Sequence, residues 1–469
     1  MSKNEKLYKK LTNTKKNSWH EYSTKEHKTI HTFAEEYKTF LQKSKTERMC
    51  IANIKELLTK AGFKNIVKIT SLKKGDKFYK EVKGKAIFAG IVGKQPESLK
   101  IIGSHVDSPR LDLKPNPVYE DSELSLLKTH YYGGVKKYHW VNTPLELHGT
   151  IITKKGKKVD IHIGDKQTDP KFIIPDLLPH LARNQMERKA DKLIEGEELN
   201  IIVGSIPVKD EKIKEQIKFS VLQHLYETYD IHEEDFNCAE LQLVPATNPI
   251  EIGFDRGLIG AYGHDDKVCA YTSLRALLDT KKPTQTAIAM FVDKEEIGSM
   301  GDTGAASFIL EQFTYDYTQC LQNTKKNHTI NHRKMLENAV SISADVTAAM
   351  DPNFKDVNDS QNVSYLGKGV SIEKYGGGGG KYSTNDAHAE FMGYLRNLLA
   401  KHNIPWQTGE LGKVDMGGGG TIAMFMSRYG MDCVDAGPAV LGMHSPCEVV
   451  SKADIYSAYK LYKVFFETE

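Results

Sequence analysis

The stretch that most constrains this chain is a short apolar run followed by two adjacent glutamates. Thr286 to Met290 has the pattern of a buried strand, and Glu295 and Glu296 follow it before three glycines break the pattern between residues 298 and 304. Two anions at the mouth of a buried strand are unfavourable because they lose water. A metal cation would offset that cost, and a free carboxylate beside it could act as a base. For this stretch alone, a solvated turn is the simpler interpretation.

The same arrangement recurs at other short apolar strands. Polar residues lie at or just past the ends of the runs Leu99 to Gly103, Ile259 to Gly263, Val340 to Ala344 and Ala439 to Met443. In an open α/β sheet, ligands bind at the carboxyl edge of the strands. Two imidazoles and several carboxylates are suited to zinc, manganese or cobalt. The candidate set is His105, Asp265, Glu295, Glu296, Asp345 and His444.

Each candidate also has an ordinary interpretation. A single histidine at a strand end is usually only hydrogen-bonded, and Asp265 or Asp345 could be a helix N-cap. Six such residues on one sheet edge are harder to explain in that way, so together they predict a metal site. Asp107, two residues after His105, could orient its imidazole.

The order of strand-like and helix-like segments predicts the fold. Their alternation indicates an α/β protein with a largely parallel, twisted sheet flanked by helices. The pattern changes in the middle of the chain, where Val135 to Gly164 alternates like strands, with a hairpin turn at Lys154 to Lys157. We therefore expect residues 1–114 and 250–469 to form one α/β domain, interrupted by an inserted mixed β/α domain at 115–249.

Composition excludes some classes of function. The chain has 469 residues, with 64 Lys and Arg against 61 Asp and Glu, so its net charge of +3 gives no strong attraction to nucleic acid or to an anionic membrane. No apolar run is long enough to span a bilayer, and the start lacks the apolar core of a signal peptide. Six scattered cysteines without CxxC spacing predict reduced thiols in a cytoplasmic protein.

Two glycine runs, Gly376 to Gly380 and Gly417 to Gly420, suggest mobile loops near a site. Glycine-rich loops can also hold phosphate through backbone amides. Neither run matches GxGxxG or GxxxxGK[ST], and neither clearly joins a strand to a helix. Nucleotide binding is therefore disfavoured.

Taken in order, the motifs resemble those of the aspartyl aminopeptidase / aminopeptidase I family of metallopeptidases. The similarity covers most of the chain, including the inserted region, and five ordered motifs make it specific. The segments that carry it are 104–109, Asp265-Asp266, 293–299, 343–345 and 443–445, with 140–149 and 174–181 in the insertion.

The resemblance implies a zinc-exopeptidase type of fold and two divalent metal ions per subunit. Zinc is the expected metal, with manganese or cobalt as alternatives. One ion would be held by His105 and Asp345, the other by Glu296 and His444, and Asp265 would bridge both.

The resemblance also assigns the remaining roles. Glu295 would be the general base, and Asp107 would orient a ligand histidine. Asp265 is preferred to Asp266 as the bridge because the family's bridging Asp precedes an Asn or Asp. The inserted domain would mediate dimer contacts within a homo-oligomer, a dodecamer built from dimers. His180 would reach a neighbouring subunit's active site.

The implied activity is removal of the N-terminal residue from peptides. Relatives specific for acidic residues carry histidines in the segment that matches 346–352, whereas this chain has none, and 380–386 looks closer to the aminopeptidase I branch. We therefore expect a neutral, hydrophobic or broad preference, with Lys381 and Tyr382 as candidate substrate contacts. The alternatives are an acidic-residue-specific aminopeptidase, a dinuclear-metal deacylase of N-acyl amino acids, and a non-catalytic protein that keeps the fold.

Overall fold

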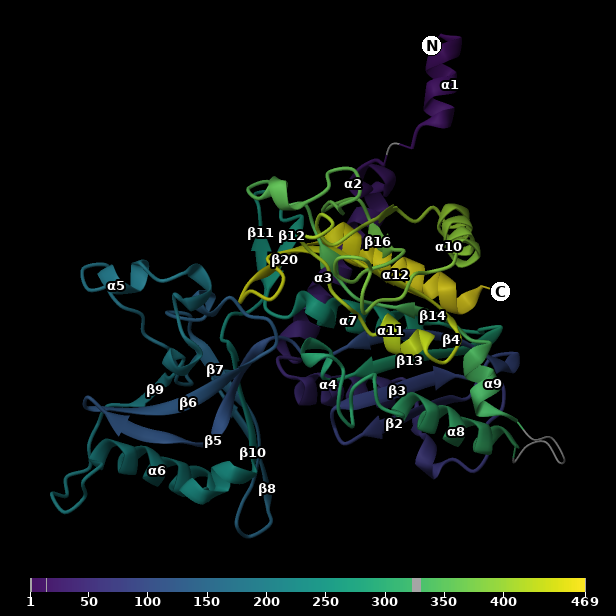
Figure 1. Ribbon diagram of the computed structural model, residues 1–469. Helices are drawn as coiled ribbons and strands as arrows, with labels where there is room; N and C mark the ends of the chain where they lie inside the picture. Colours follow the sequence, from purple (N-terminus) through teal and green to yellow (C-terminus); the bar gives the residue numbers. More distant parts are fainter. Residues whose placement is uncertain (1, 14, 323–329, 469) are drawn as a thin grey trace.

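A mixed sheet of nine strands forms the centre of the larger part of the computed structural model, which describes residues 2–13, 15–322 and 330–468 (Figure 1). Its strands, in spatial order, are β1 (Lys64–Asn65), β2 (Lys77–Val82), β3 (Ala86–Ile91), β13 (Gln285–Val292), β4 (Gln95–His105), β14 (Val340–Ser343), β18 (Asp432–Gly437), β16 (Val370–Glu373) and β17 (Trp406–Thr408).

The four central strands, β13, β4, β14 and β18, run parallel. They are short and rich in buried Ile, Val and Ala, as expected for strands that helices cover on both faces. Val292 pairs with His105, and Ser343 pairs with Gly103, so β13, β4 and β14 end at the same edge. The predicted α/β class with a largely parallel centre is confirmed.

Helices cover both faces of this sheet. On one face pack α3 (Thr24–Gln42), α4 (Glu47–Lys60), α7 (His264–Asp279), α10 (Ala389–Lys401) and α12 (Lys452–Glu467). On the other pack α8 (Ile309–Gln322), α9 (His332–Glu337) and α11 (Ala423–Ser427). The short helices α1 (Lys3–Leu11) and α2 (Ser18–Glu21) precede them.

Helix α3 shows how the sequence specifies these elements. Ser23 and Glu26 form a reciprocal capping box at its start. Phe33, Tyr37 and Phe40 then recur at helical spacing and are buried against the sheet-facing core.

A second sheet, also within the described residues, has five short strands. In spatial order they are β11 (Ile250–Ile252), β12 (Leu258–Ala261), β20 (Glu448–Ser451), β19 (Ala439–Leu441) and β15 (Thr347–Ala348). The chain passes from β18 of the first sheet to β19 of the second through Gly437 and Pro438. The expectation that all the candidate residues leave one sheet is therefore wrong, because the strands before Asp265 and His444 belong to this second sheet.

A third, entirely antiparallel sheet of six described strands forms the smaller part of the molecule (Figure 1). The smaller part also contains helices α5 (Arg183–Met186) and α6 (Gln216–Tyr229). Its apolar core is separate from the two cores that lie on the faces of the nine-stranded sheet. That this part is a dimerisation domain with bounds 115–249 stays a prediction. Its strands are β8 (Lys158–Ile163), β7 (Leu145–Ile152), β10 (Ala239–Pro245), β5 (Arg110–Asp121), β6 (Leu124–Tyr132) and β9 (Ile201–Gly204).

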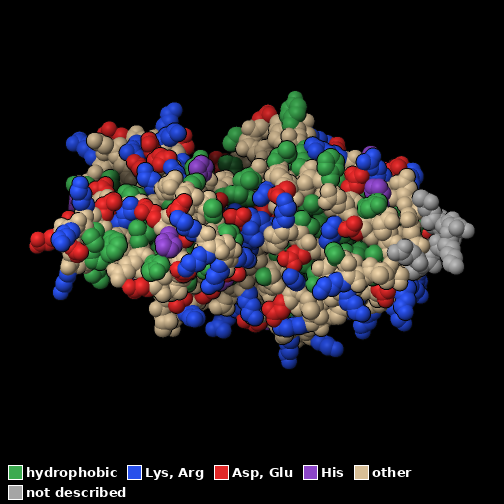
Figure 2. Space-filling view, turned by 90° about the horizontal axis from the view of Figure 1, so that it is seen from below, with side chains coloured by type: hydrophobic (Ala, Val, Ile, Leu, Met, Phe, Trp, Pro, Cys, Tyr) green, Lys and Arg blue, Asp and Glu red, His purple; other side chains and the backbone are tan. Residues whose placement is uncertain are grey.

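The surface agrees with the nearly neutral composition. Figure 2 shows Lys and Arg side chains mixed with Asp and Glu on the face in view, without a large region of one charge. In the described part of the chain, no helix has both the length and the apolar character needed to cross a bilayer.

The crossing between the first two sheets requires a glycine. A Cβ on Gly437 would lie 2.0 Å from the backbone oxygen of Asp345. We expect Gly437→Ala to force the two segments apart and to lower the free energy of unfolding by about 1–3 kcal/mol. Urea titration measures this.

The matched control is Gly393→Ala in the middle of α10, where a new Cβ meets nothing within 4 Å. That change should raise stability by about 0.5–1 kcal/mol. If Gly437→Ala were as stable as the wild type, the close approach of Gly437 to the Asp345 backbone would be contradicted.

Candidate metal centre

Four of the candidate residues come from the common edge of the nine-stranded sheet. His105 is the last residue of β4, and Asp345 lies two residues past the end of β14. After β13 the chain reverses through Lys294, which has a left-handed φ of 68°, into a 3₁₀ turn that carries Glu295 and Glu296. The parallel register of these strands therefore places the four side chains near one another.

Two further candidates come from the five-stranded sheet. Asp265 follows β12 at the start of α7, and its peptide bond to Asp266 is cis. His444 follows β19. The carboxylate of Glu448 accepts hydrogen bonds from both backbones, 2.9 Å from the nitrogen of Asp265 and 2.8 Å from that of His444. Glu448 thus ties the two segments together.

The Asp265 carboxylate lies at the centre of the cluster. Its Oδ1 is 3.1 Å from His105 Nε2, and its Oδ2 is 3.1 Å from His444 Nε2. Glu296 Oε2 lies 3.3 Å from His444 Nε2. Asp345 Oδ1 lies 3.8 Å from His105 Nε2. The Asp265 carboxylate thus lies between the two imidazoles, with Asp345 beside His105 and Glu296 beside His444.

Glu295 differs from its neighbour. Its Oε2 lies 3.8 Å from His105 Nε2, and its side chain keeps more exposure than that of Glu296, 15% against 3%. The carboxylate is thus inside the cluster but still open to small molecules from solvent.

Asp107 fixes both the histidine and the glutamate turn. Its Oδ1 is 3.3 Å from His105 Nδ1, and the backbone nitrogens of Glu295 and Glu296 donate to its two oxygens at 3.2 Å each. The hydroxyl of Tyr132, at the end of β6, donates to Asp107 Oδ2 at 2.8 Å. A single buried carboxylate thus holds groups from three strands in one arrangement.

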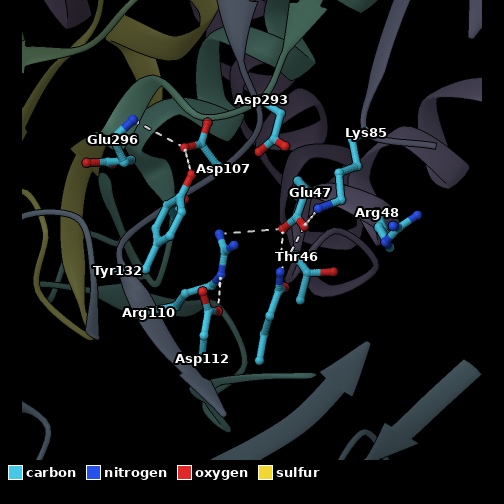
Figure 3. Close-up of polar contacts among 12 residues, drawn as sticks. Thr46, Glu47, Arg48, Lys85, Asp107, Arg110, Asp112, Tyr132, Asp293 and Glu296 are labelled. Carbon is cyan, nitrogen blue, oxygen red and sulfur yellow. Dashed lines mark hydrogen bonds and ion pairs between the residues drawn. The ribbon is translucent and has the colours of Figure 1, made fainter. Parts of the chain in front are cut away.

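A polar chain extends from this carboxylate toward α4 (Figure 3). The Arg110 guanidinium lies over the Tyr132 ring, 3.8 Å from its centroid. It also pairs with Asp112 at 2.8 Å and with the fully buried Glu47 at 3.5 Å. Figure 3 shows Lys85 on the far side of Glu47, 3.6 Å from its carboxylate. This chain connects the antiparallel sheet, through Tyr132, to the cluster.

Burial gives the cluster an unusual charge balance. Burial opposes protonation of the two imidazoles, but the nearby carboxylates outweigh it, raising the pKa of His105 well above its ordinary value and that of His444 to about 10. Burial, together with the negative charge of Asp265, raises the pKa of Glu296 well above its usual range. Burial is also the main cause of the raised pKa of Glu295, which is about 7. The protein alone thus supplies too little positive charge for its acids.

The donors fit divalent cations. The Oδ1 of Asp266 and the Oε1 of Glu296 are buried without a hydrogen-bond partner among the described residues. One nitrogen or oxygen atom from each of His105, Asp265 and Glu296 lies within 4.8 Å of the others, and the same holds for His105, Asp266 and Asp345. Imidazole and carboxylate donors in this arrangement are suited to zinc.

The three predicted substrate contacts are not bonded to the cluster in the described part of the chain. His180 is exposed on the loop before α5, and Figure 1 places α5 on the outer side of the smaller part. Lys381 pairs with Asp386 at 2.9 Å, and Tyr382 is 76% exposed. Within the described residues, no hydrogen bond or ion pair joins these three side chains to the cluster, so their predicted roles stay predictions.

The two glycine runs, by contrast, meet each other. The backbone nitrogen of Gly377 donates to the oxygen of Gly419 at 2.7 Å, and a Cβ on Gly418 would lie 2.0 Å from the oxygen of Gly377. They form one folded unit and not two separate loops.

Sequence reasoning missed two supporting residues. Tyr132 ends a strand that pairs with β5, and only the tertiary fold reveals its contact with Asp107. Glu448 lies four residues after His444, with no spacing signal that predicts its hydrogen bonds. Closeness to His444 could have marked Glu448 as a candidate, whereas Tyr132 lies 25 residues from Asp107 and has no such signal.

The fold and the cluster of imidazoles and carboxylates are typical of metallohydrolases, and comparison with known proteins defines the family. Residues 40–466 match the family model described as aminopeptidase I zinc metalloprotease (M18). A probable M18 family aminopeptidase 1 from Clostridium acetobutylicum is 46% identical over 96% of this chain and 97% of its own. The counterpart from Thermotoga maritima is 47% identical over 97% of this chain and 99% of its own.

Solved structures agree. The crystal structure of an M18 family aminopeptidase from Thermotoga maritima aligns with a TM-score of 0.92 and 46% identity, covering 98% of this chain and all of the other. A dodecamer of mApe1 from S. cerevisiae aligns with a TM-score of 0.74 at 22% identity, covering 92% of this chain and 96% of the other, which supports the fold alone. The chain belongs to the M18 family of zinc aminopeptidases, which are metallopeptidases and exopeptidases. The predicted family and aminopeptidase activity are confirmed, and the deacylase and non-catalytic alternatives are not favoured.

Removing the Tyr132 hydroxyl should weaken metal binding. Tyr132→Phe removes the hydroxyl that donates to the Asp107 carboxylate, so the carboxylate holds the His105 ring less firmly. Loss of such an outer partner reduces metal affinity by about ten- to a hundredfold. Competition for zinc against a chelator of known affinity measures it.

The neighbouring residue gives the control. Tyr131 is 42% exposed, so Tyr131→Phe should leave zinc affinity unchanged. Equal zinc affinity in Tyr132→Phe and the wild type would show that Asp107 does not depend on this hydrogen bond.

Proposed function

We propose that this aminopeptidase binds two zinc ions, one on each side of the Asp265 carboxylate. The observation that carries this is that the two oxygens of Asp265 each lie 3.1 Å from a different imidazole. His105 and Asp345 would hold one ion, and Glu296 and His444 the other. Manganese or cobalt could take the same donors. When bound, such ions polarise a scissile carbonyl and acidify water.

Glu295 is the proposed general base. It lies beside His105 but is not needed to complete either donor group, and burial raises the pKa of its carboxyl to about 7. A carboxylate so placed takes a proton from the attacking water and passes it to the leaving amine. Asp107 holds the turn that carries Glu295 through its backbone nitrogen. The Asp107 carboxylate therefore positions both the proposed base and His105.

Glu295→Gln tests this role. The amide keeps the shape of the side chain but cannot accept the proton, so turnover should fall by about a hundredfold or more. Zinc content should stay at the wild-type value. The measurement is kcat on a peptide amide together with metal analysis.

Glu56→Gln on the exposed surface of α4 is the control and should retain full turnover. Near-wild-type turnover in Glu295→Gln would remove Glu295 from the role. Loss of zinc in that variant would instead make it a ligand.

The preferred N-terminal residue is proposed to be neutral or hydrophobic, with broad acceptance. The segment 346–352 offers neither histidine nor another basic side chain to an acidic substrate. The Lys381 ammonium is already paired with Asp386 and stacked 3.7 Å from the centroid of Tyr375. An acidic substrate side chain would therefore have to displace an existing ion pair.

A panel of aminoacyl amides tests the preference. We expect Leu, Met and Ala substrates to have a higher kcat/KM than Asp and Glu substrates by about tenfold or more, a difference of about 1.4 kcal/mol in transition-state stabilisation. Faster cleavage of the Asp and Glu substrates would contradict the proposal and favour the acidic-residue-specific alternative.

The chain is proposed to work as a homo-oligomer in the cytoplasm. The loop before α5 exposes Leu177, Leu178 and Leu181 around His180, and a cluster of exposed apolar side chains is typical of a contact surface. The exposed leucines, together with the dodecamer of a distant relative, support assembly into a homo-oligomer. The proposed oligomer is built from dimers, and His180 reaches a neighbouring subunit's site. All six cysteines are free, which is typical of a reducing compartment.

A further inference from the structure

A second group of side chains of the types that hold metal ions lies outside the candidate metal centre, at the edge of the antiparallel sheet. His148 on β7 pairs directly across the ladder with His162 on β8, the edge strand. Asp165 follows β8 two residues after its end. One nitrogen or oxygen atom from each of these three residues lies within 4.8 Å of the others.

The strand period explains why these residues meet. Leu147, Ile161 and Ile163 point to the apolar core of this sheet, so Glu146, His148 and His162 point to its other face. The polar face of an edge hairpin is normally solvated. Here Glu146 and His148 are 3% and 0% exposed. Buried polar groups of this kind require partners.

The partners present do not satisfy them. His148 Nε2 has no hydrogen-bond partner in the described part of the chain, although it lies 3.1 Å from Glu146 Oε1 and 3.4 Å from Asp165 Oδ1. His148 Nδ1 faces His162 Nδ1 at 3.3 Å. Lys45 supplies the nearby positive charge, but its ammonium is 3.4 Å from Glu146 and donates to the backbone oxygens of Pro245 and Thr247.

One donor atom from each of His148, His162 and Asp165 lies within 4.8 Å of the others, and His148 gives one ring nitrogen to an ion, so small side-chain movements bring the three donors to the spacing found around one ion. Zinc–nitrogen and zinc–oxygen bonds of about 2.0–2.2 Å at tetrahedral angles place the donor atoms about 3.3–3.6 Å apart. A cavity of about 630 Å³ between α4 and the β7–β8 hairpin is lined by His162, which gives an ion a path from solvent.

We propose that His148, His162 and Asp165 bind one divalent transition-metal ion, zinc by donor type, with the Glu146 carboxylate beside the His148 ring. The ion fastens the edge strand β8 to β7 and to the loop that follows it. Since Lys45 lies at the junction of α3 and α4, the site also lies where the antiparallel sheet meets the larger part of the molecule. It is structural and takes no part in peptide cleavage.

Zinc counting on the full chain tests this inference. Wild type, His162→Ala and Asp165→Asn are dialysed at one free zinc concentration, set by a chelator buffer, and their zinc content is measured by mass spectrometry. Both variants should hold one ion per chain fewer than the wild type. The measured quantity is the difference in zinc content between each variant and the wild type, so it does not depend on how many ions the catalytic centre holds.

Asp160→Asn is the matched control. Asp160 lies on the same face of β8 and bonds Thr150 at 2.7 Å, outside the cluster. It should keep the wild-type zinc content, and all four proteins should cleave peptides at the same rate, which shows that they are folded and that their catalytic ions remain.

Equal zinc content in the wild type and both variants would overturn the inference. So would the loss of one ion in Asp160→Asn as well, because the site would then not depend on the named donors. Binding that appears only at the zinc concentrations of a crystal soak would also overturn it.

Discussion

Carboxylates crowded into a buried place are the constraint on which the rest of this structure depends. Asp265 and its acidic neighbours lie where two sheets meet, and burial raises the pKa of Glu295, Glu296 and Asp345. Two imidazoles cannot balance that charge. A protein keeps such an arrangement only if cations complete it. The metal requirement therefore follows from the burial of the acids as well as from the types of donor.

Several features of the fold serve this one arrangement. The parallel register brings the ends of β4, β13 and β14 to one edge, and the second sheet brings Asp265 and His444 against it. Asp107 and Glu448 then link segments that are far apart in sequence, each through hydrogen bonds to two backbone nitrogens. The geometry of the cluster is thus held mainly by hydrogen bonds from backbone nitrogens to two buried carboxylates.

The sequence predicted the α/β class and the close approach of the six candidate residues, because strand ends in a parallel sheet share an edge. It could not predict that Asp265 and His444 come from a separate sheet, since β12 and β19 are too short to reveal their partners. The supporting roles of Tyr132 and Glu448 were missed because their contacts join residues far apart in sequence, and those of Glu448 are made to backbone nitrogens. The roles predicted for His180, Lys381 and Tyr382 involve a neighbouring subunit or bound substrate and stay predictions.

The most direct test of this account is anomalous X-ray diffraction at the zinc edge from crystals of the zinc-loaded protein. The account predicts two strong peaks on either side of the Asp265 carboxylate, one beside His105 and Asp345 and the other beside Glu296 and His444. A single peak, or peaks that do not share Asp265, would contradict it.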